Sequence, residues 1–514
     1  MPDNLQILKV SCAGGEITHN DVLSQAEQAP GSARRLINYE SDVQGGYRRL
    51  SGYTNTFTSL PGTGKTLGVA VADGIQQGIL AAREPSSGNN FLHYWDFTNT
   101  PQWRTVTISP TLTFTNIDKV RFIKYDLGTR RVLIVDGINK AAYYDASSGY
   151  VQITHANAPT NPSLATEFKS HIFLAGATDA TQLHFSAPLN ETDFSPAAGA
   201  GVINVGFDIV AIKAFRDQLF IFGSGNIRKL VGNSLADFQL LPVTDDLGCL
   251  ASDSIVEIGG DILFLGPDGI RPVSATDRIG DVELETVSKN IQSVFNRIVS
   301  TEDLSKINTV LVRSKSQMRM FLGNADQAGI ILGLRQMSNG GIGYEFGELV
   351  GFDTTCAASG YVGTTEFVIH GTSDGKVMQQ EVGTSFNGEN ILSIFSSPFY
   401  HMGDPELRKT FQRVSTYFRS EGLSVVRMGV IYDFEDSATI NPSDFEITTE
   451  GAAAIYNTAT FNSSDIYDGN PSPVRRTNIV GSGLSISVVY VTDDTRASHS
   501  VQGLTILFGI GDRR

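Results

Sequence analysis

The feature that most constrains this chain is a short segment that recurs in its central part. Residues 168–176, 215–223 and 258–266 share one order: an apolar residue, a polar turn, four apolar residues and a closing glycine. The closing glycines of the three copies are 47 and 43 residues apart. An apolar run that follows a tight polar turn is typical of a buried strand in a β-hairpin. Each copy therefore predicts a hairpin.

Weaker copies extend the pattern on both sides. They end near Arg83, Gly137, Gly323 and Gly371, which brings the number of units to about seven. A period of roughly 40–50 residues is the signature of the four-stranded blades of a propeller. We therefore expect residues 56–385 to form a β-propeller of six or seven blades.

One interruption between two units has helical spacing. Apolar residues stand at positions 287, 291, 294, 295 and 298, which is the i, i+4, i+7, i+8, i+11 pattern of one helix face. A helix with a single apolar stripe usually packs on its own core. We predict such a helix on the flank of the propeller, with a partner-binding helix as the alternative.

The pattern changes after about residue 390. Residues 426–432, 484–490 and 504–510 alternate strictly between apolar and polar, which indicates antiparallel strands with one buried face. We expect an all-β chain in which residues 386–514 form an antiparallel β-sandwich or platform, and residues 1–55 add strands to it. We also expect the propeller to fold without residues 391–514.

Charge and cysteine content limit the classes of function. The chain has 39 Lys and Arg against 54 Asp and Glu, a formal charge of -15, which disfavours sequence-specific nucleic-acid binding. Cys12, Cys249 and Cys356 show neither disulfide nor zinc spacing. No apolar run reaches the ~18 residues of a spanning helix, so we expect no membrane insertion and folding in a reducing cytoplasm.

The segment Pro61–Thr66 resembles the end of a phosphate-binding loop. Ser59 stands where that motif requires glycine, and the apolar run 67–71 predicts a strand where a helix should receive the phosphates. The run Val132–Asp136 resembles a magnesium-binding strand, but the same apolar run recurs in units that lack the aspartate. We therefore predict no nucleotide site.

Other candidate motifs also lack the required spacing. The eight histidines form no zinc motif, and 433–436 and 465–469 lack the residue order of a calcium loop, although a weak Ca²⁺ site there stays open. Trp95-Asp96 is a single Trp-Asp dipeptide, and 372–375 lacks the tryptophan of a sialidase box. We assign no catalytic, cofactor-binding or metal-binding residue, and expect no enzymatic activity and no cofactor.

Segments at the two ends of the chain are similar to a known family. Residues 33–40 and 45–53 resemble the amino-terminal signature of tail tube and nozzle proteins of short-tailed (podovirus-type) bacteriophages. Residues 403–411, 431–434 and 500–504 resemble the carboxy-terminal part of the same family, the tail nozzle or tail tubular protein B.

This resemblance implies a structural virion protein. It implies a homo-hexameric ring of propeller subunits below the portal and adaptor, in a tail assembled in the host cytoplasm. The implied partners are the tail adaptor ring, the tail fibres and the double-stranded DNA that passes through the lumen without sequence-specific binding. An acidic wall would let DNA slide, since clustered Lys and Arg would hold it at each phosphate; equally, the charge of -15 could serve only solubility.

Two alternatives stay open. One is a glycan-binding or glycan-cleaving propeller, such as a tail depolymerase, for which a paired carboxylate and exposed aromatic platforms would be needed. The other is a head-completion or adaptor protein of the same virion.

Overall fold

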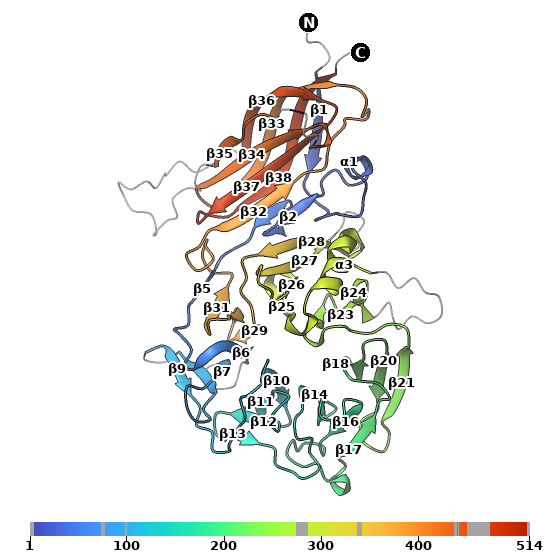
Figure 1. Ribbon diagram of the computed structural model, residues 1–514, viewed down its shortest axis with the longest axis vertical. Coiled ribbons are helices and arrows are strands. Elements are labelled where there is room, and N and C mark those ends of the chain that lie inside the picture. The colour runs from blue at the N-terminus through green and yellow to red at the C-terminus, as the bar shows by residue number, and fades with distance from the viewer. Residues whose placement is uncertain are drawn as a thin grey trace.

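The computed structural model describes residues 5–72, 78–97, 100–273, 286–336, 342–435, 439, 441–449 and 473–510. Strands dominate, and they form a ring of sheets with a two-layered sandwich on its flank (Figure 1). This arrangement confirms the predicted fold class, an all-β chain with a β-propeller and a carboxy-terminal antiparallel sandwich. The helices described are short: α1 (Ser24–Gln28), α3 (Gln292–Thr301), and the 3-10 turns η1 (Pro196–Ala198), η2 (Ser252–Ser254), η3 (Lys289–Ile291), η4 (Leu304–Lys306), η5 (Arg313–Lys315) and η6 (Asp433–Glu435).

The propeller has seven blades within the described residues. In each blade antiparallel strands follow the chain order, apart from one amino-terminal strand that joins the last blade, and the first strand of most blades lines the central channel. The blades are β6–β9 (Thr63–Val71, Ile79–Glu84, Leu92–Asp96, Gln102–Thr105), β10–β13 (Arg121–Asp126, Arg130–Val135, Ala142–Asp145, Gly149–Gln152), β14–β17 (Leu164–Phe168, His171–Ala175, Gln182–Phe185, Gly201–Asn204), β18–β21 (Ala211–Phe215, Gln218–Phe222, Ile227–Val231, Gln239–Thr244), β22–β24 (Val256–Ile258, Asp261–Gly266, Gly269–Pro272), β25–β28 (Asn308–Val312, Gln317–Phe321, Ala328–Gln336, Ile342–Val350), and β29–β31 (Cys356–Val362, Thr365–Gly371, Val377–Gln380) with β5 (Tyr53–Thr54).

The three repeated segments are the inner hairpins of consecutive blades, as predicted. β14–β15, β18–β19 and β22–β23 pair with two residues in each turn. In the first turn Lys169 and Ser170 have φ of 49° and 63°, and in the third Gly259 and Gly260 have φ of 62° and 81°. Two successive positive φ angles are what a type I′ hairpin turn needs, because its twist matches that of the strands.

A strand from the amino-terminal side completes the last blade. β5 pairs with β31, with Thr54 opposite Gln379 and Tyr53 opposite Gln380. The ring is thus closed by a strand that lies just before the expected propeller boundary at residue 56. Since an edge strand left unpaired exposes a row of backbone donors and acceptors, this pairing satisfies the outer edge of β31.

The predicted helix is α3, preceded by the turn η3. Ile291, Val294, Phe295 and Ile298 are buried in a cluster with residues of β23–β28, while Val287 is half-buried and precedes the helix. The apolar stripe therefore packs on the blades of its own chain. No helix among the described residues has the length and apolar character needed to cross a membrane.

The sandwich is built from both ends of the chain. We call one layer the terminal sheet and the other the bridging sheet. The terminal sheet has the order β3 (Tyr39–Ser41), β4 (Tyr47–Arg49), β38 (His499–Ile510), β33 (Lys409–Ser420) and β36 (Val474–Gly483), with β1 (Leu5–Ser11) also on β38. The bridging sheet continues blade β25–β28 through β2 (Arg35–Ile37), β32 (Ile391–Ser396), β37 (Ile486–Asp494), β34 (Ser424–Tyr432) and β35 (Phe445–Thr449).

The bridging sheet makes one hydrogen-bonded structure of the propeller and the sandwich. β2 lies parallel to β28, with Ile37 opposite Glu348, and antiparallel to β32, with Leu36 opposite Phe395. The alternating residues of β33, β34, β37 and β38 point into a shared core, as their sequence pattern predicts; the core includes Val414, Val426, Met428, Val488, Tyr490, Leu504, Ile506 and Phe508.

Candidate functional site

The central channel of the propeller is one candidate site. It encloses about 630 Å³ and is lined by first strands of the blades, including β6, β10, β14, β18, β25 and β29. A volume of this size is that of a small-molecule pocket. Inner strands present their edges and some side chains to such a channel, so its chemistry depends on the charged groups that they carry.

A bridge of charged groups crosses this channel. Lys119 and Arg121 of the second blade reach Asp253, which precedes the fifth blade: Lys119 Nζ is 2.9 Å from Asp253 Oδ2, and Arg121 Nε is 2.8 Å from Asp253 Oδ1. Lys119 also donates to the carbonyl of Ile307, and Arg121 to that of Ser163. In a ring of seven blades, the second and fifth lie on opposite sides. The bridge therefore connects opposite sides of the channel.

The charges of the bridge compensate one another. Burial opposes ionisation of Asp253, but Arg121 and Lys119 outweigh it and hold the pKa of its carboxyl below the ordinary value. Burial lowers the pKa of Lys119, although Asp253 opposes this shift. A half-buried ion pair with hydrogen bonds on both partners acts as a structural brace, since removal of one partner would leave a poorly compensated charge.

The structure places Thr63–Thr66 of the segment that resembles a phosphate-binding loop on a strand. Lys65 lies in β6, its side chain is 39% exposed, and its Nζ is 3.2 Å from Asp118 Oδ1. No helix follows to bind phosphates, since β6 runs to Val71. Asp136 caps a turn by accepting from the backbone N–H groups of Ile138 and Asn139.

The other singled-out residues are also engaged or buried. Cys12, Cys249 and Cys356 are free and buried, and burial raises the pKa of Cys249 and of Cys356 to about 11. Asp433 accepts from Leu484 N–H and from Thr439, while Asp436 and 465–469 lie outside the described residues. Among the described residues no group of three His, Cys, Asp or Glu side chains is placed to hold a metal ion.

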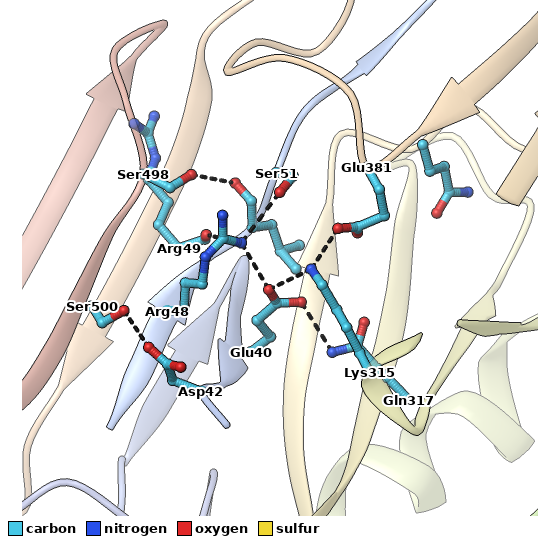
Figure 2. Close-up of polar contacts among 12 residues, drawn as sticks. Glu40, Asp42, Arg48, Arg49, Ser51, Lys315, Gln317, Glu381, Ser498 and Ser500 are labelled. Carbon is cyan, nitrogen blue, oxygen red and sulfur yellow. Dashed lines mark hydrogen bonds and ion pairs between the residues drawn. The ribbon is translucent and has the colours of Figure 1, made fainter. Parts of the chain in front are cut away.

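A second candidate site is a buried cluster of charges where the sandwich meets the propeller. We call it the junction, and Figure 2 shows most of it. Glu40 of β3 lies at its centre: its Oε1 is 2.9 Å from Arg48 NH1 and 2.7 Å from Lys315 Nζ, and its Oε2 accepts from Gln317 at 3.0 Å. The junction also includes Glu381 and Arg319, which pair with each other, while Lys315 pairs with Glu381.

The junction joins three parts of the chain. Glu40 and Arg48 come from the amino-terminal strands, Lys315 and Arg319 from the sixth blade, and Glu381 follows the last strand of the seventh. Burial would raise the pKa of Glu381, but Arg319 and Lys315 lower it to about 2. The carboxylate is therefore ionised near neutral pH, and the cluster connects the two blades to the sandwich.

Arg49 makes a further buried connection. Its side chain is completely inaccessible, and its guanidinium donates to Asp494 Oδ1 at 2.8 Å and to the carbonyls of Ile391, Asp494 and Arg496. Arg49 lies on β4 of the terminal sheet, whereas its acceptors lie on or just after β32 and β37 of the bridging sheet. It therefore ties the two layers of the sandwich together.

Sequence reasoning missed the roles of these charges. Glu40, Arg48 and Arg49 stand inside the amino-terminal signature, and apart from the pair that Glu40 and Arg48 form with each other, their main charged partners are hundreds of residues away. A usable signal was the density of charge in 33–53, where the neighbouring residues alternate as strands. Asp253, Lys119 and Arg121 carry no spacing motif at all.

A buried carboxyl at the bridging sheet gives a pH-dependent prediction. Glu16 accepts from Leu36 N–H at 3.2 Å, and burial, followed by the nearby Glu348, raises the pKa of Glu16 well above its ordinary value. A carboxyl whose pKa is higher in the folded chain than in the unfolded chain favours folding at low pH, where it is protonated. This contribution to the free energy of unfolding is fully present below the unfolded-state pKa and is lost as the pH rises through the folded-state pKa. Glu16→Gln keeps the acceptor and removes the charge, so its Tm should exceed that of the wild type at pH 8.

Thermal melts of both proteins at pH 4 and pH 8 check this expectation. The two should melt together at pH 4, where Glu16 is protonated in the wild type. Glu435→Gln, an exposed carboxylate paired with Arg34, serves as the control and should show no comparable gain. An equal difference between Glu16→Gln and wild type at both pH values would contradict the burial argument.

The fold and the site define an all-β chain: a seven-bladed propeller braced across its channel and joined to a sandwich through buried ion pairs. No protein-family model matches the chain, and no curated protein matches it. Among solved structures, the chain is similar to the WD40 β-propeller domain of Doa1 (10% identity, TM-score 0.39, 64% of this chain and 98% of that one).

Two further solved structures resemble it to a similar degree. U3-55K matches with 10% identity and a TM-score of 0.39, over 65% of this chain and 98% of that one. The computationally designed Ika8 protein matches with 12% identity and a TM-score of 0.33, over 63% of this chain and 98% of that one. The propeller assignment rests on the order of the strands in the sheets described above.

Proposed function

We propose that the chain is a structural protein of a bacteriophage virion, the tail nozzle of a short-tailed phage, without enzymatic activity. In this proposal six copies form a ring below the portal and adaptor, tail fibres dock on its outside, and the genome leaves through the central lumen. The resemblance of residues 33–40, 45–53 and 403–411 to that family supports it.

The main support for the proposal is the structural role of residues in the amino-terminal signature. Asn38, at φ 52°, donates to the carbonyls of Val350 and Leu392 and so fastens the sixth blade to the sandwich. A Cβ on Gly46 would lie 2.4 Å from Val501 O, and one on Gly52 would lie 2.1 Å from Ser385 O. The signature thus consists of residues that this particular union of propeller and sandwich requires.

The carboxy-terminal segments that resemble the family contact one another. Arg408 NH2 is 3.6 Å from Asp433 Oδ2, and Arg408 NH1 donates to Ser482 O at 3.0 Å. Asp433 also accepts from Leu484 N–H at 2.6 Å. Segments 403–411 and 431–434 therefore form one polar corner at the end of the sandwich, which supports reading them as parts of a single signature.

The channel of each propeller is unsuited to DNA, which bears on where the conduit would lie. The bridge from Lys119 and Arg121 to Asp253 crosses it, and its volume of about 630 Å³ suits a small molecule. A conduit for a duplex would therefore lie between subunits of a ring. The formal charge of -15 would favour sliding, because few phosphates would be neutralised there.

Negative-stain imaging and native mass measurement of the purified full-length chain test this function. We expect a six-fold ring with an open central lumen, and no release of oligosaccharides from bacterial surface polysaccharide. A monomer that cleaves such polysaccharide would replace the proposal by the depolymerase alternative. A ring that binds the portal directly, without an intervening ring, would favour the head-completion or adaptor alternative.

A further inference from the structure

The outward side of the terminal sheet is a regular array of residues, most of which are exposed or half-buried. Strand registers place sixteen residues in four rows across β1, β38, β33 and β36, on the side opposite the sandwich core. We call this side the cationic face. Its rows are Leu5–Gly509–Thr410–Ser482, Ile7–Leu507–Arg413–Asn478, Lys9–Thr505–Ser415–Arg476 and Ser11–Gly503–Tyr417–Val474.

The cationic face differs in charge from the chain as a whole. Its sixteen positions hold Lys9, Arg413 and Arg476 but no Asp or Glu, in a chain with a formal charge of -15. Within the described residues none of these three cations forms an ion pair. Apolar groups lie between them: Ile7 is 58% exposed and Tyr417 is 37% exposed.

The outward side of the bridging sheet has the opposite character. Glu446, Arg427, Val491 and Ile394 form one row across β35, β34, β37 and β32. Asp493 lies opposite Leu392 in a neighbouring row. We call this side the acidic face; its apolar members are Val425, Val489, Val491, Ile394 and Leu392.

A third carboxylate adds to the acidic face. Asp444 Oδ1 lies 3.1 Å from the position that a Cβ on Gly429 would occupy, and Gly429 pairs with Val489 on this side of the sheet. Three carboxylates therefore stand with two cations, Arg427 and the exposed Arg35 of β2, which lies opposite Ser396 in the row of Val489. Glu446, Asp493 and Asp444 form no ion pair among the described residues, so their charges are free to meet an external partner.

We propose that the cationic face of one copy of this chain packs on the acidic face of the next copy. The two faces match in kind, since each presents β-branched or other apolar side chains among charges of opposite sign. They lie on opposite sides of one sandwich, so the contact is head to tail and generates a ring when the rotation closes. The inference rests on the proposed function and deepens it by naming the surfaces through which the ring assembles.

The size of the face is adequate for such a contact. Its strands have 7 to 12 residues, and at ~3.3 Å per residue and ~4.8 Å between strands they cover roughly 650 Å². A standard protein interface buries ~800 Å² on each partner. The sheet face therefore supplies most of one interface, with opposite charges that fix its register and exclude pairing of like faces.

Charge reversal on each face tests the proposal. Lys9→Glu with Arg476→Glu reverses two exposed cations of one row, and Glu446→Lys with Asp493→Lys reverses two carboxylates of the other face. Each pair of substitutions should weaken assembly about tenfold or more, measured by sedimentation velocity at 150 mM salt. The four substitutions together should restore assembly, because the complementarity is recreated with its signs exchanged. Arg130→Glu, on an exposed pair of the second blade, is the control and should assemble normally.

The outcomes separate the inference from the function on which it rests. Wild-type rings that persist unchanged in both reversed variants would overturn the proposed interface and leave the nozzle function standing. A wild-type chain that stays monomeric across the concentration range would overturn both. Loss of assembly in the reversed variants without recovery in the fourfold variant would also overturn the pairing of these two faces. Circular dichroism and melting of each variant establish that it is folded.

Discussion

Replacing Arg49 with methionine is expected to be among the most damaging single changes in this chain. The side chain is fully buried, and its loss removes the cation that pairs with Asp494 and the donor to the carbonyls of Ile391 and Arg496 inside the sandwich. Removal of one partner of a buried pair typically costs about 3–5 kcal/mol. Chemical denaturation of the purified protein should show a loss of this size, or the variant should fail to fold.

The matched control is Arg130→Met, which removes an arginine that is 65% exposed and paired with Asp126. Surface changes of this kind usually stay within about 0.5 kcal/mol. Arg49→Lys should fall between the two, since an ammonium can reach some acceptors but lacks the planar fork of donors. A methionine variant as stable as the control would show that Arg49 is not a tie between the layers.

Deleting residues 391–514 is expected to abolish soluble expression of the remaining chain. This reverses the expectation drawn from the sequence, in which the propeller would fold alone. The deletion removes β32, which pairs with β2, and β38, which pairs with β1 and β4. It also removes Asp494, so that Arg49 keeps neither its carboxylate nor its covering layer.

A second fragment separates this explanation from a defect in the propeller itself. Residues 50–390 retain β5 and all seven blades but omit the amino-terminal strands that need the sandwich. This fragment should be the more soluble of the two, judged by size-exclusion chromatography and limited proteolysis. A soluble, monomeric chain of residues 1–390 would contradict the view that the two ends depend on each other.

Local periodicity explains what the sequence predicted correctly. The hairpins at 168–176, 215–223 and 258–266 and the alternating strands after residue 390 are set by side chains close together in the chain, so their pattern is visible without a structure. The helix α3 was visible for the same reason. The non-glycine turn at Lys169 and Ser170 was less visible, because its positive φ angles are imposed by the flanking strands.

The connections between units were not predictable in this way. β2 and β28 meet in parallel across more than 300 residues, Ile37 opposite Glu348, and three-residue strands such as β2 leave no period to detect. The junction depends on the same distant pairings: Glu40 is an ordinary exposed-strand residue in the sequence until Lys315 and Gln317 are placed beside it. Lys119 and Arg121 likewise reach Asp253 only because the closed ring places the second and fifth blades across one channel. No local sequence motif predicts that closure.

The pairing of β5 with β31 also determines the order in which parts of the fold can form during synthesis. Thr54 is synthesised more than 300 residues before its partner Gln379. Leu5 of β1 is likewise synthesised long before its partner Gly509. At ~5–20 residues per second the early strands spend tens of seconds without their partners during synthesis. Early blades can fold as they emerge, while the ring must remain open until β31 has been synthesised and the sandwich until β38 has been synthesised. Ribosome-bound intermediates of this protein therefore expose β1, β2 and β5 as unpaired edges, which is where a chaperone would be needed to prevent aggregation.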